Sequence, residues 1–509
     1  MSLFRKKSLT ALLAQAADSE KGLKRTLGAG SLVALGIGAI IGAGLFVRTA
    51  AAAGQAAGPA VTLSFIVAAV GCAFAGLCYA EFAAMIPIAG SAYAYSYVTM
   101  GELIAWIIGW ALIMEYALGA ATVSIAWSEY LNRLFNGGIP YAWCHSPFES
   151  FTDAAGVHQQ GIINLPALLI LLLITLLLIK GTAESAVVNS IIVFVKVAIV
   201  IIFIIVGWQF MKPENHTPYM IPAGTPPVVD QAGKVIADYS GWNKHGWGGV
   251  LGGAAIVFFA FIGFDAVSTA AQEAKNPKRD MPIGILGSLV VCTILYILFG
   301  HVLTGVASWK DFVDPAKGRE ASVVYAISTY MHGYQWLAKS VTVAILAGFS
   351  SVILVMLMGQ SRVFYTMSTD GLLPKIFSVL HPKFRTPYKS NIILFIFVGL
   401  FAAFVPGSVA GDLTSFGTLF AFVLVSIGVF ILRVKSPNIE RPFRAPLAPV
   451  VSVLGAAICL LMIIGLDKNT LIAAFAWMIL GLFVYFLYSR HNSKLKTPGE
   501  ILPKAKDFN

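Results

Sequence analysis

The stretch LGIGAIIGAGLFVRTAAAAGQAAGP, from Leu35 to Pro59, begins as an apolar membrane-type segment and then departs from that pattern. Its first charged residue is Arg48. Four glycines lie within nine consecutive residues, namely Gly36, Gly38, Gly42 and Gly44. A helix in lipid must hydrogen-bond its own backbone, so residues that let a helix come apart are unexpected there. The stretch therefore describes either a helix packed closely against its neighbours or a helix that is broken.

The composition of the whole chain is that of a membrane protein. Its 509 residues are 58% hydrophobic and 12% charged, and their mean hydropathy is +0.81. A soluble domain carries about twice this charged fraction. The five cysteines show no disulfide framework and no metal-ligand spacing, and the sequence contains no phosphate-binding G-x-x-x-x-G-K-[ST] loop. We therefore expect a polytopic membrane protein without a cofactor, and neither an enzyme nor an ATP-driven motor.

Twelve apolar segments approach the roughly 20 residues that a helix needs to cross the hydrocarbon core. They cover about 31–49, 60–86, 101–131, 162–180, 186–211, 247–271, 283–306, 337–366, 389–406, 412–434, 447–466 and 471–488. We expect an all-α integral membrane protein with an N-terminal tail (1–30), a first five-helix repeat (31–211), a second five-helix repeat (247–434), helices eleven and twelve (447–488) and a C-terminal tail (489–509). The longest loops, about 132–161 and 212–246, look irregular.

The distribution of basic residues predicts the orientation of the chain in the membrane. With the N-terminus inside, cytoplasmic segments hold 24 of the 35 Lys and Arg residues and the opposite loops hold 10. Cytoplasmic loops carry such an excess, so we expect both termini on the cytoplasmic side of the cell membrane. The net charge of +11 then reflects topology, and the expected surroundings are a lipid bilayer and not a nucleic acid. The sequence does not identify an accessory subunit.

A second interrupted helix decides between packing and breakage in the first. Gly38-x-x-x-Gly42 alone fits a small-residue helix contact, although Gly42 and Gly44 lie roughly 17 Å into the span, near the bilayer midplane. The sixth span, with FFAFIGFDAVSTAAQE at Phe258–Glu273, also carries a mid-helix glycine, Gly263. Interrupted helices at corresponding positions of two halves indicate a transporter's midplane site. Spans one and six are five apart, as two inverted five-helix repeats require, so we expect Gly36 and Gly38 to pack and Gly42 and Gly44 to permit a break.

Four long motifs give the chain a family resemblance. It resembles the amino acid–polyamine–organocation transporters, and among them the bacterial relatives of the cationic amino acid transporters. The motifs are GIGAIIGAGLFV, CYAEFAAMIPIAGSAYAYSYVTMGELIAWIIGWALIMEY, GFDAVSTAAQEAKNPKRDMPIGI and DGLLPKIFSVLHPKFRTPY. They lie within a resemblance that extends from about residue 25 to 445. It implies a LeuT-like fold with broken helices one and six, two extra C-terminal helices, and transport of L-amino acids by alternating access.

The resemblance also implies a substrate site made from both breaks. The break at Gly42-Ala43-Gly44 would expose N–H groups at the start of a half-helix, whose positive end suits a substrate carboxylate. The substrate ammonium would bind backbone carbonyls from the two breaks, at Ile40, Ile41, Phe259, Ala260 and Ile262. The side chain of Phe259 matches the aromatic gate that covers the substrate in this family, although an ordinary core aromatic is the alternative.

Lys196 lies in the apolar run SIIVFVKVAIVIIFIIVG of span five, about 15 Å from its cytoplasmic start. A charged lysine at such a depth costs roughly 3 kcal/mol, which makes it a functional candidate. The alternative is a permanent structural partner of a carboxylate or of carbonyls. Sodium-independent members of the family that the chain resembles have a lysine where sodium-coupled relatives bind sodium. Burial disfavours the charged form of an amine, so we expect Lys196 to exchange a proton during transport, and we expect no sodium site.

Two further residues bear on the substrate. Glu115, about 21 Å into span three, either contacts the substrate or joins a polar network. Met356, in span eight, is the residue that the family pattern places beside the substrate side chain, where its bulk would narrow the pocket. We therefore expect import of a small or medium neutral L-amino acid, such as alanine. A cationic amino acid transporter, or an amino acid/polyamine exchanger on the same fold, remains the alternative.

Other intramembrane charges have structural interpretations. Asp265 lies one to two turns from the second break, where it would cap or pair locally. Glu81, Glu102 and Arg362 lie toward the inner ends of their helices, where they would serve a cytoplasmic gate or reach the interface. An enzyme would need converging His, Cys or paired carboxylates, and a channel would need a continuous polar ring. The sequence shows neither pattern.

Overall fold

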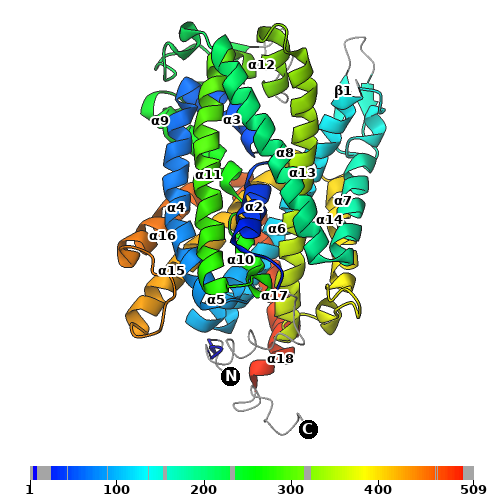
Figure 1. Cartoon of the computed structure of the whole chain (residues 1–509), viewed down its shortest axis with the longest axis vertical. Helices are drawn as coiled ribbons and strands as arrows, with labels where there is room; N and C mark the ends of the chain where they lie inside the picture. Colours follow the sequence, from blue (N-terminus) through cyan, green and yellow to red (C-terminus); the bar gives the residue numbers. More distant parts are fainter. Residues whose placement is uncertain are drawn as a thin grey trace.

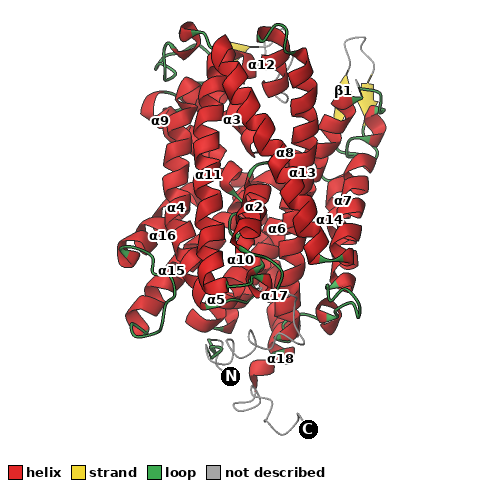
Figure 2. Cartoon of the chain, viewed as in Figure 1, coloured by secondary structure: helices red, strands yellow, loops and turns green. Residues whose placement is uncertain are grey.

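The computed structural model describes residues 4–8, 25–42, 44–88, 90–135, 137–152, 158–229, 235–313, 322–464, 466 and 468–496. Most of its long helices run along the long axis of the molecule (Figure 1). The strands among the described residues form short hairpins toward one end (Figure 2). One hairpin pairs β1 (Ser150–Thr152) with β2 (His158–Gln160), and the other pairs β3 (Val228–Val229) with β4 (Val235–Ala237). The two long loops are therefore partly ordered as hairpins, which corrects the expectation that they are irregular.

The helices coincide with the apolar segments of the sequence. Among the described residues, eight helices are long and apolar enough to cross a membrane, and four shorter apolar helices accompany them. In chain order the α-helices are α2 (Ala29–Ile40), α3 (Thr49–Ala52), α4 (Val61–Met85), α5 (Ser91–Thr99), α6 (Glu102–Leu134), α7 (Leu165–Lys180), α8 (Thr182–Gly207), α9 (Gly246–Phe258), α10 (Ala266–Thr269), α11 (Pro277–Val306), α12 (Ser322–Tyr330), α13 (Gln335–Thr369), α14 (Tyr388–Phe404), α15 (Gly407–Lys435), α16 (Ala448–Ile464), α17 (Lys468–Val484) and α18 (Arg490–Asn492). The sequence did not predict α5 and α12, because nine-residue helices are too short to register as apolar spans.

The first apolar segment is interrupted where the glycines are. Helix α2 ends at Ile40, Ile41 takes an extended conformation (φ −77°, ψ 97°), and helical structure resumes as a π-helical turn, η1 (Gly44–Arg48). Ala43, one of the predicted site residues, lies outside the described residues. The N–H groups of Leu45 and Phe46 both donate to the carbonyl of Gly42, at 3.2 and 3.4 Å. The backbone therefore re-forms its hydrogen bonds directly after the break.

The sixth apolar segment is interrupted in a related way. Helix α9 passes into a 3₁₀ turn, η8 (Phe259–Phe261), after which Ile262 has φ −58° and ψ 136°. Gly263 follows with a φ of 111°, a backbone conformation that side chains disfavour. Helical structure resumes with α10 at Ala266. Helices α2 and α10 lie near the middle of the molecule, among longer helices (Figure 1).

Glycines let the two breaks touch backbone to backbone. A Cβ added at Gly44 would overlap the Cα of Ala260, and one added at Gly263 would lie 2.8 Å from the Cβ of Ala39. A Cβ at Gly38 would meet the Oδ1 of Asn189 at 2.5 Å. Gly38 thus serves packing against α8, while Gly44 and Gly263 serve the contact between the breaks. Both sequence interpretations, packing and breakage, apply to different glycines of the same segment.

The remaining helices surround this centre and present apolar side chains outward. Helix α11 packs on α4 and α2, while α13 and α15 pack on α6. Large apolar side chains on the outer helices are exposed, such as Phe194 on α8 (75%) and Leu461 on α16 (68%). Such exposure is unfavourable in water and natural in lipid, which agrees with the expected bilayer surroundings.

Gly263→Ala tests whether the second break depends on its glycine. The new Cβ would meet Ala39 and the positive φ would be strained, so we expect the free energy of unfolding to fall by about 2 kcal/mol or more. Thermal unfolding of purified protein in detergent measures this loss. Gly30→Ala is the control, because a Cβ there meets nothing within 4 Å. Equal unfolding temperatures for the two variants would contradict the account.

Candidate functional site

A small cavity lies between the two breaks. Its volume is about 20 Å³, which is close to what one water molecule needs. Six of the predicted site residues line it, namely Ile40, Gly42, Gly44, Phe259, Ile262 and Met356. The structure therefore brings together residues from spans one, six and eight. A ligand larger than water would fit only after the lining residues move apart.

The cavity also has walls that the sequence did not predict. Gly119 and Val123 come from α6, Val352 comes from α13 one turn before Met356, and Thr414 comes from α15. A Cβ added at Gly119 would lie 3.3 Å from Thr414 and 3.8 Å from the sulfur of Met356. None of the described residues that line the cavity is an acid or a base. Its side-chain walls are therefore mainly apolar.

Phe259 carries a partner that the sequence did not suggest. The guanidinium carbon of Arg48 lies 5.1 Å from the centre of the Phe259 ring. Arg48 ends the turn that follows the first break, and Phe259 begins the turn that precedes the second. A cation over an aromatic face is an attractive contact. The pair thus joins the two interrupted helices at the cavity wall.

Lys196 contacts the first break directly, although it does not line the cavity. Its side chain is fully buried, and its Nζ donates to the carbonyls of Gly38 at 2.9 Å and Ile41 at 2.8 Å. These are carbonyls at the C-terminal end of α2, where a helix lacks internal donors and carries partial negative charge. In the described part of the chain no carboxylate pairs with this amine. The alternative interpretation of Lys196, as a permanent structural partner, requires a carboxylate or carbonyls. The structure contains the carbonyls.

Tyr296 of α11 contacts the carbonyls of Ile40 and Ala260. The sequence interpretation did not include this residue. Its hydroxyl lies 2.7 Å from the carbonyl oxygen of Ile40 and 2.9 Å from that of Ala260. Ile40, Ile41 and Ala260 were expected to bind a substrate ammonium, and each carbonyl has a side-chain partner here. A carbonyl oxygen has two lone pairs, so these contacts leave acceptor capacity for a ligand. A buried tyrosine in an apolar helix gives no sequence signal of such a role.

Glu115 lies behind the cavity wall. Its carboxyl group is fully buried, and neither oxygen has a hydrogen-bond partner among the described residues. A Cβ at Gly417 of α15 would lie 3.1 Å from the Cβ of Glu115. The adjacent Tyr116 donates its hydroxyl to Asp265 Oδ2 at 2.7 Å. Asp265 thus pairs with a tyrosine of α6 and makes no side-chain cap bond to α10, which differs from the local cap or pair expected from the sequence. Glu115 does not line the cavity in this arrangement.

Ion pairs and hydrogen bonds join the helix ends on the side of the chain termini. Arg362 of α13 pairs with Glu273, and both side chains are buried. Glu81 of α4 pairs with Arg433 at 2.6 Å and Arg441 at 3.2 Å. The carboxylate of Glu102 accepts from hydroxyl groups of three residues, Tyr97, Tyr485 and Ser493. The three charged residues expected near the inner ends therefore form contacts that join different helices at this end.

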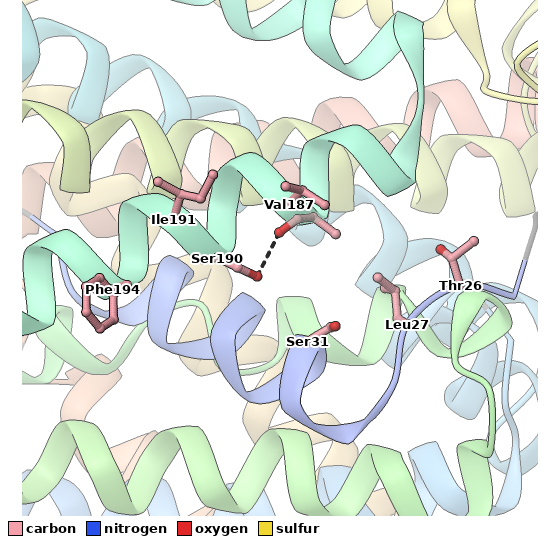
Figure 3. A pocket seen from close by; sticks show the side chains of 8 residues that line it. Thr26, Leu27, Ser31, Val187, Ser190, Ile191 and Phe194 are labelled. Atoms are coloured by element: carbon pink, nitrogen blue, oxygen red, sulfur yellow. Dashed lines mark hydrogen bonds between the residues drawn. The ribbon is translucent and has the colours of Figure 1, made fainter.

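A second, open hollow of about 480 Å³ lies between α8 and the segment that enters α2 (Figure 3). Ser31 contributes from α2, and Ser190 contributes from α8, where its hydroxyl donates to the carbonyl of Ala186 at 2.8 Å. Ile191 and Phe194, two of its apolar walls, are mostly exposed. The hollow shares no lining residue with the cavity between the breaks, so the two spaces are separate.

Comparisons with known proteins agree on a family. The family described as amino acid permease matches residues 27–488. The chain is 44% identical to the branched-chain amino acid permease BcaP of Bacillus subtilis and 42% identical to the methylthioribose transporter of the same organism, each over 97% of this chain and 99% of the relative. It is 33% identical to the human cationic amino acid transporter 4, over 85% of this chain and 63% of that protein.

Glu273→Gln tests the buried ion pair with Arg362. The change leaves a buried guanidinium without its counter-charge, so we expect the free energy of unfolding to fall by about 3–5 kcal/mol. Thermal unfolding in detergent provides the measurement. Glu440→Gln is the matched control, because the Lys278–Glu440 pair spans 3.6 Å with side chains 66% and 85% exposed, and its loss should cost less than about 1 kcal/mol. Similar losses in both variants would show that burial does not strengthen the pair.

Proposed function

Because the chain belongs to the amino acid permease family, we propose that it imports L-amino acids across the cell membrane by alternating access, with the paired helix breaks as the substrate site. The family is one of transporters, so the chain is a transporter and not an enzyme. The observation that carries the proposal is the cavity enclosed by both breaks. Near it lie carbonyls from both breaks and the N-terminal end of the turn Gly44–Arg48, which suit the two charged ends of an amino acid zwitterion.

Each end of the zwitterion has a matching part of the site. The turn Gly44–Arg48 presents the N-terminal end of a helix, which attracts a carboxylate. The carbonyls of Ile40 and Ala260 converge on one point, since a single hydroxyl reaches both. An ammonium beside that hydroxyl could donate to the second lone pair of each carbonyl. Phe259 would close over the ligand, with Arg48 stacked on its ring.

The walls favour a neutral side chain of small to medium size. An Arg or Lys substrate would bring a charge that no described wall residue compensates, and a buried unpaired charge is costly. Val123, Val352 and Met356 instead suit an aliphatic group. Alanine remains the size expected from Met356, and the likeness to BcaP extends the proposal to branched-chain amino acids. The likeness to the methylthioribose transporter makes that neutral thioether the second candidate.

The proposed coupling ion is the proton, carried by Lys196. A protonated lysine has three N–H donors and a neutral one has two. Two donors suffice for the carbonyls of Gly38 and Ile41, so the proton can leave without breaking either contact. A charged Lys196 would hold the negative end of α2 more strongly than a neutral one. Protonation would thereby change the strength of the contact between α8 and the first break.

The arrangement in the membrane belongs to the same proposal. Twelve spans, formed by the eight long and four shorter apolar helices, would leave both termini in the cytoplasm. Spans one to five and six to ten would form a LeuT-like pair of inverted repeats, with α16 and α17 as the extra helices. Segments near both ends of the chain meet in support of this, because Arg5 donates to the carbonyl of Leu495 at 3.0 Å.

Uptake by reconstituted protein tests the proposed substrate. Labelled alanine, leucine, arginine and methylthioribose are offered to liposomes under an inward proton gradient and without one. We expect saturable uptake of alanine or leucine that rises at least about tenfold with the gradient, with little uptake of arginine, since the walls lack a counter-charge. Arginine selectivity would contradict the pocket argument. Methylthioribose uptake without amino acid uptake would favour the second candidate.

Lys196→Met tests the coupling role of the amine. Methionine fills similar space but donates no hydrogen bond, so the buried carbonyls of Gly38 and Ile41 lose their donor and we expect the free energy of unfolding to fall by about 1–3 kcal/mol. Gradient-driven accumulation should be lost. Lys180→Met, at the exposed end of α7, should accumulate substrate normally. A Lys196→Met protein that still concentrates substrate under a pH gradient would refute the role of Lys196.

A further inference from the structure

The hydroxyl of Tyr296 sits between the two helix breaks. It lies 2.7 Å from the carbonyl oxygen of Ile40, the last residue of α2, and 2.9 Å from that of Ala260, in the turn before the second break. The residue is fully buried. Tyr296 is therefore a direct polar link between the two breaks.

The two carbonyls need a partner because the breaks remove their helical ones. In an unbroken helix, Ile40 would accept from the N–H four residues later, at Gly44, and Ala260 would accept from that of Phe264. The extended residues Ile41 and Ile262 divert the chain before those bonds form. A buried carbonyl without a donor is costly. The tyrosine hydroxyl supplies the hydrogen that the broken helices cannot.

Packing holds that hydroxyl in place. The Tyr296 ring lies 5.3 Å from the ring of Phe65 and 5.3 Å from that of Phe261, measured between centroids. Ile40, Phe259 and Ile262 line the cavity. Tyr296 and Ala260 themselves are not among the described residues that line it. Tyr296 therefore acts through the two carbonyls and not by contact with a ligand. This makes it a positioning residue for the substrate site.

A hydroxyl has one hydrogen to donate and an ammonium has three, so an ammonium can form more hydrogen bonds to the same carbonyls. A loaded carrier has the substrate ammonium to satisfy them, whereas an empty carrier has only what the protein provides. Net uptake requires the empty carrier to reorient, while exchange requires only the loaded carrier to do so. The hydrogen bonds of Tyr296 thus matter most in the step that distinguishes the two modes.

We propose that Tyr296 stands in for the substrate ammonium at the carbonyls of Ile40 and Ala260, and so allows the empty carrier to reorient. The inference rests on the proposed function, and it assigns the choice between net uptake and obligatory exchange to one phenol hydroxyl. Without that hydroxyl, the carbonyls of Ile40 and Ala260 have a hydrogen-bond donor only when substrate is bound. The transporter then becomes an exchanger.

Tyr296→Phe tests the inference in reconstituted liposomes. One assay follows labelled substrate into liposomes that contain no amino acid, under an inward proton gradient. The other follows the same substrate into liposomes preloaded with its unlabelled form. We expect Tyr296→Phe to lower the rate of net uptake at least about tenfold, the effect of one lost buried hydrogen bond, and to leave exchange within about twofold of the wild type.

The matched control is Tyr79→Phe. Tyr79 of α4 is equally buried, and its hydroxyl has no hydrogen-bond partner among the described residues. Both transport modes should be unchanged in this variant. Retained exchange by Tyr296→Phe is itself evidence of a folded carrier, because exchange requires the complete substrate site.

The other outcomes separate the two claims. Equal losses of net uptake and exchange in Tyr296→Phe would show a merely structural role and overturn the inference, as would unchanged net uptake. Wild-type protein that exchanges but never takes up substrate into empty liposomes would overturn it as well. Wild-type protein that moves no amino acid in either assay would instead refute the proposed function.

Discussion

The hydrogen bonds that a broken membrane helix loses are the constraint on which the rest of this structure depends. Lipid offers no donors, so each carbonyl freed by a break needs a partner from the protein or from a ligand. Lys196 serves Gly38 and Ile41, and Tyr296 serves Ile40 and Ala260. Helices α8 and α11 are thereby tied to the centre through side chains that would otherwise be unexpected in apolar surroundings.

The same constraint connects stability with function. A break whose carbonyls all have hydrogen-bond donors is stable but leaves few acceptors for a ligand. A break whose carbonyls lack donors would unfold locally. One hydroxyl shared by two carbonyls, and an amine that can give up a proton and keep two donors, lie between these extremes. The close approach of Gly44 to Ala260 adds a second condition, since the two breaks must touch for their carbonyls to converge. The same few residues therefore determine both the hydrogen bonding and the packing of the two breaks.

The sequence predicted the helices and both breaks, because apolar length and clustered glycines leave local signals. A lone charge in an apolar helix also drew attention to Lys196, whose role in coupling stays a prediction. The contacts of Tyr296 left none, since a tyrosine within an apolar helix has the same pattern whether its hydroxyl is structural or functional. Gly119, Val123 and Val352 were missed because only tertiary packing decides which helix face borders the cavity. The nine-residue α5 was missed because it is shorter than a membrane span. The site roles assigned to all of the predicted residues remain predictions.

The central claim is that the paired breaks recognise both ends of an amino acid. Calorimetric titration of purified protein with L-leucine, with isopentylamine and with 4-methylpentanoate tests it most directly, because the two analogues each lack one charged group. We expect leucine to bind and each analogue to bind at least about a hundredfold more weakly, since charge-assisted hydrogen bonds contribute roughly 1.5–3 kcal/mol each. Equal affinity for leucine and either analogue would contradict it.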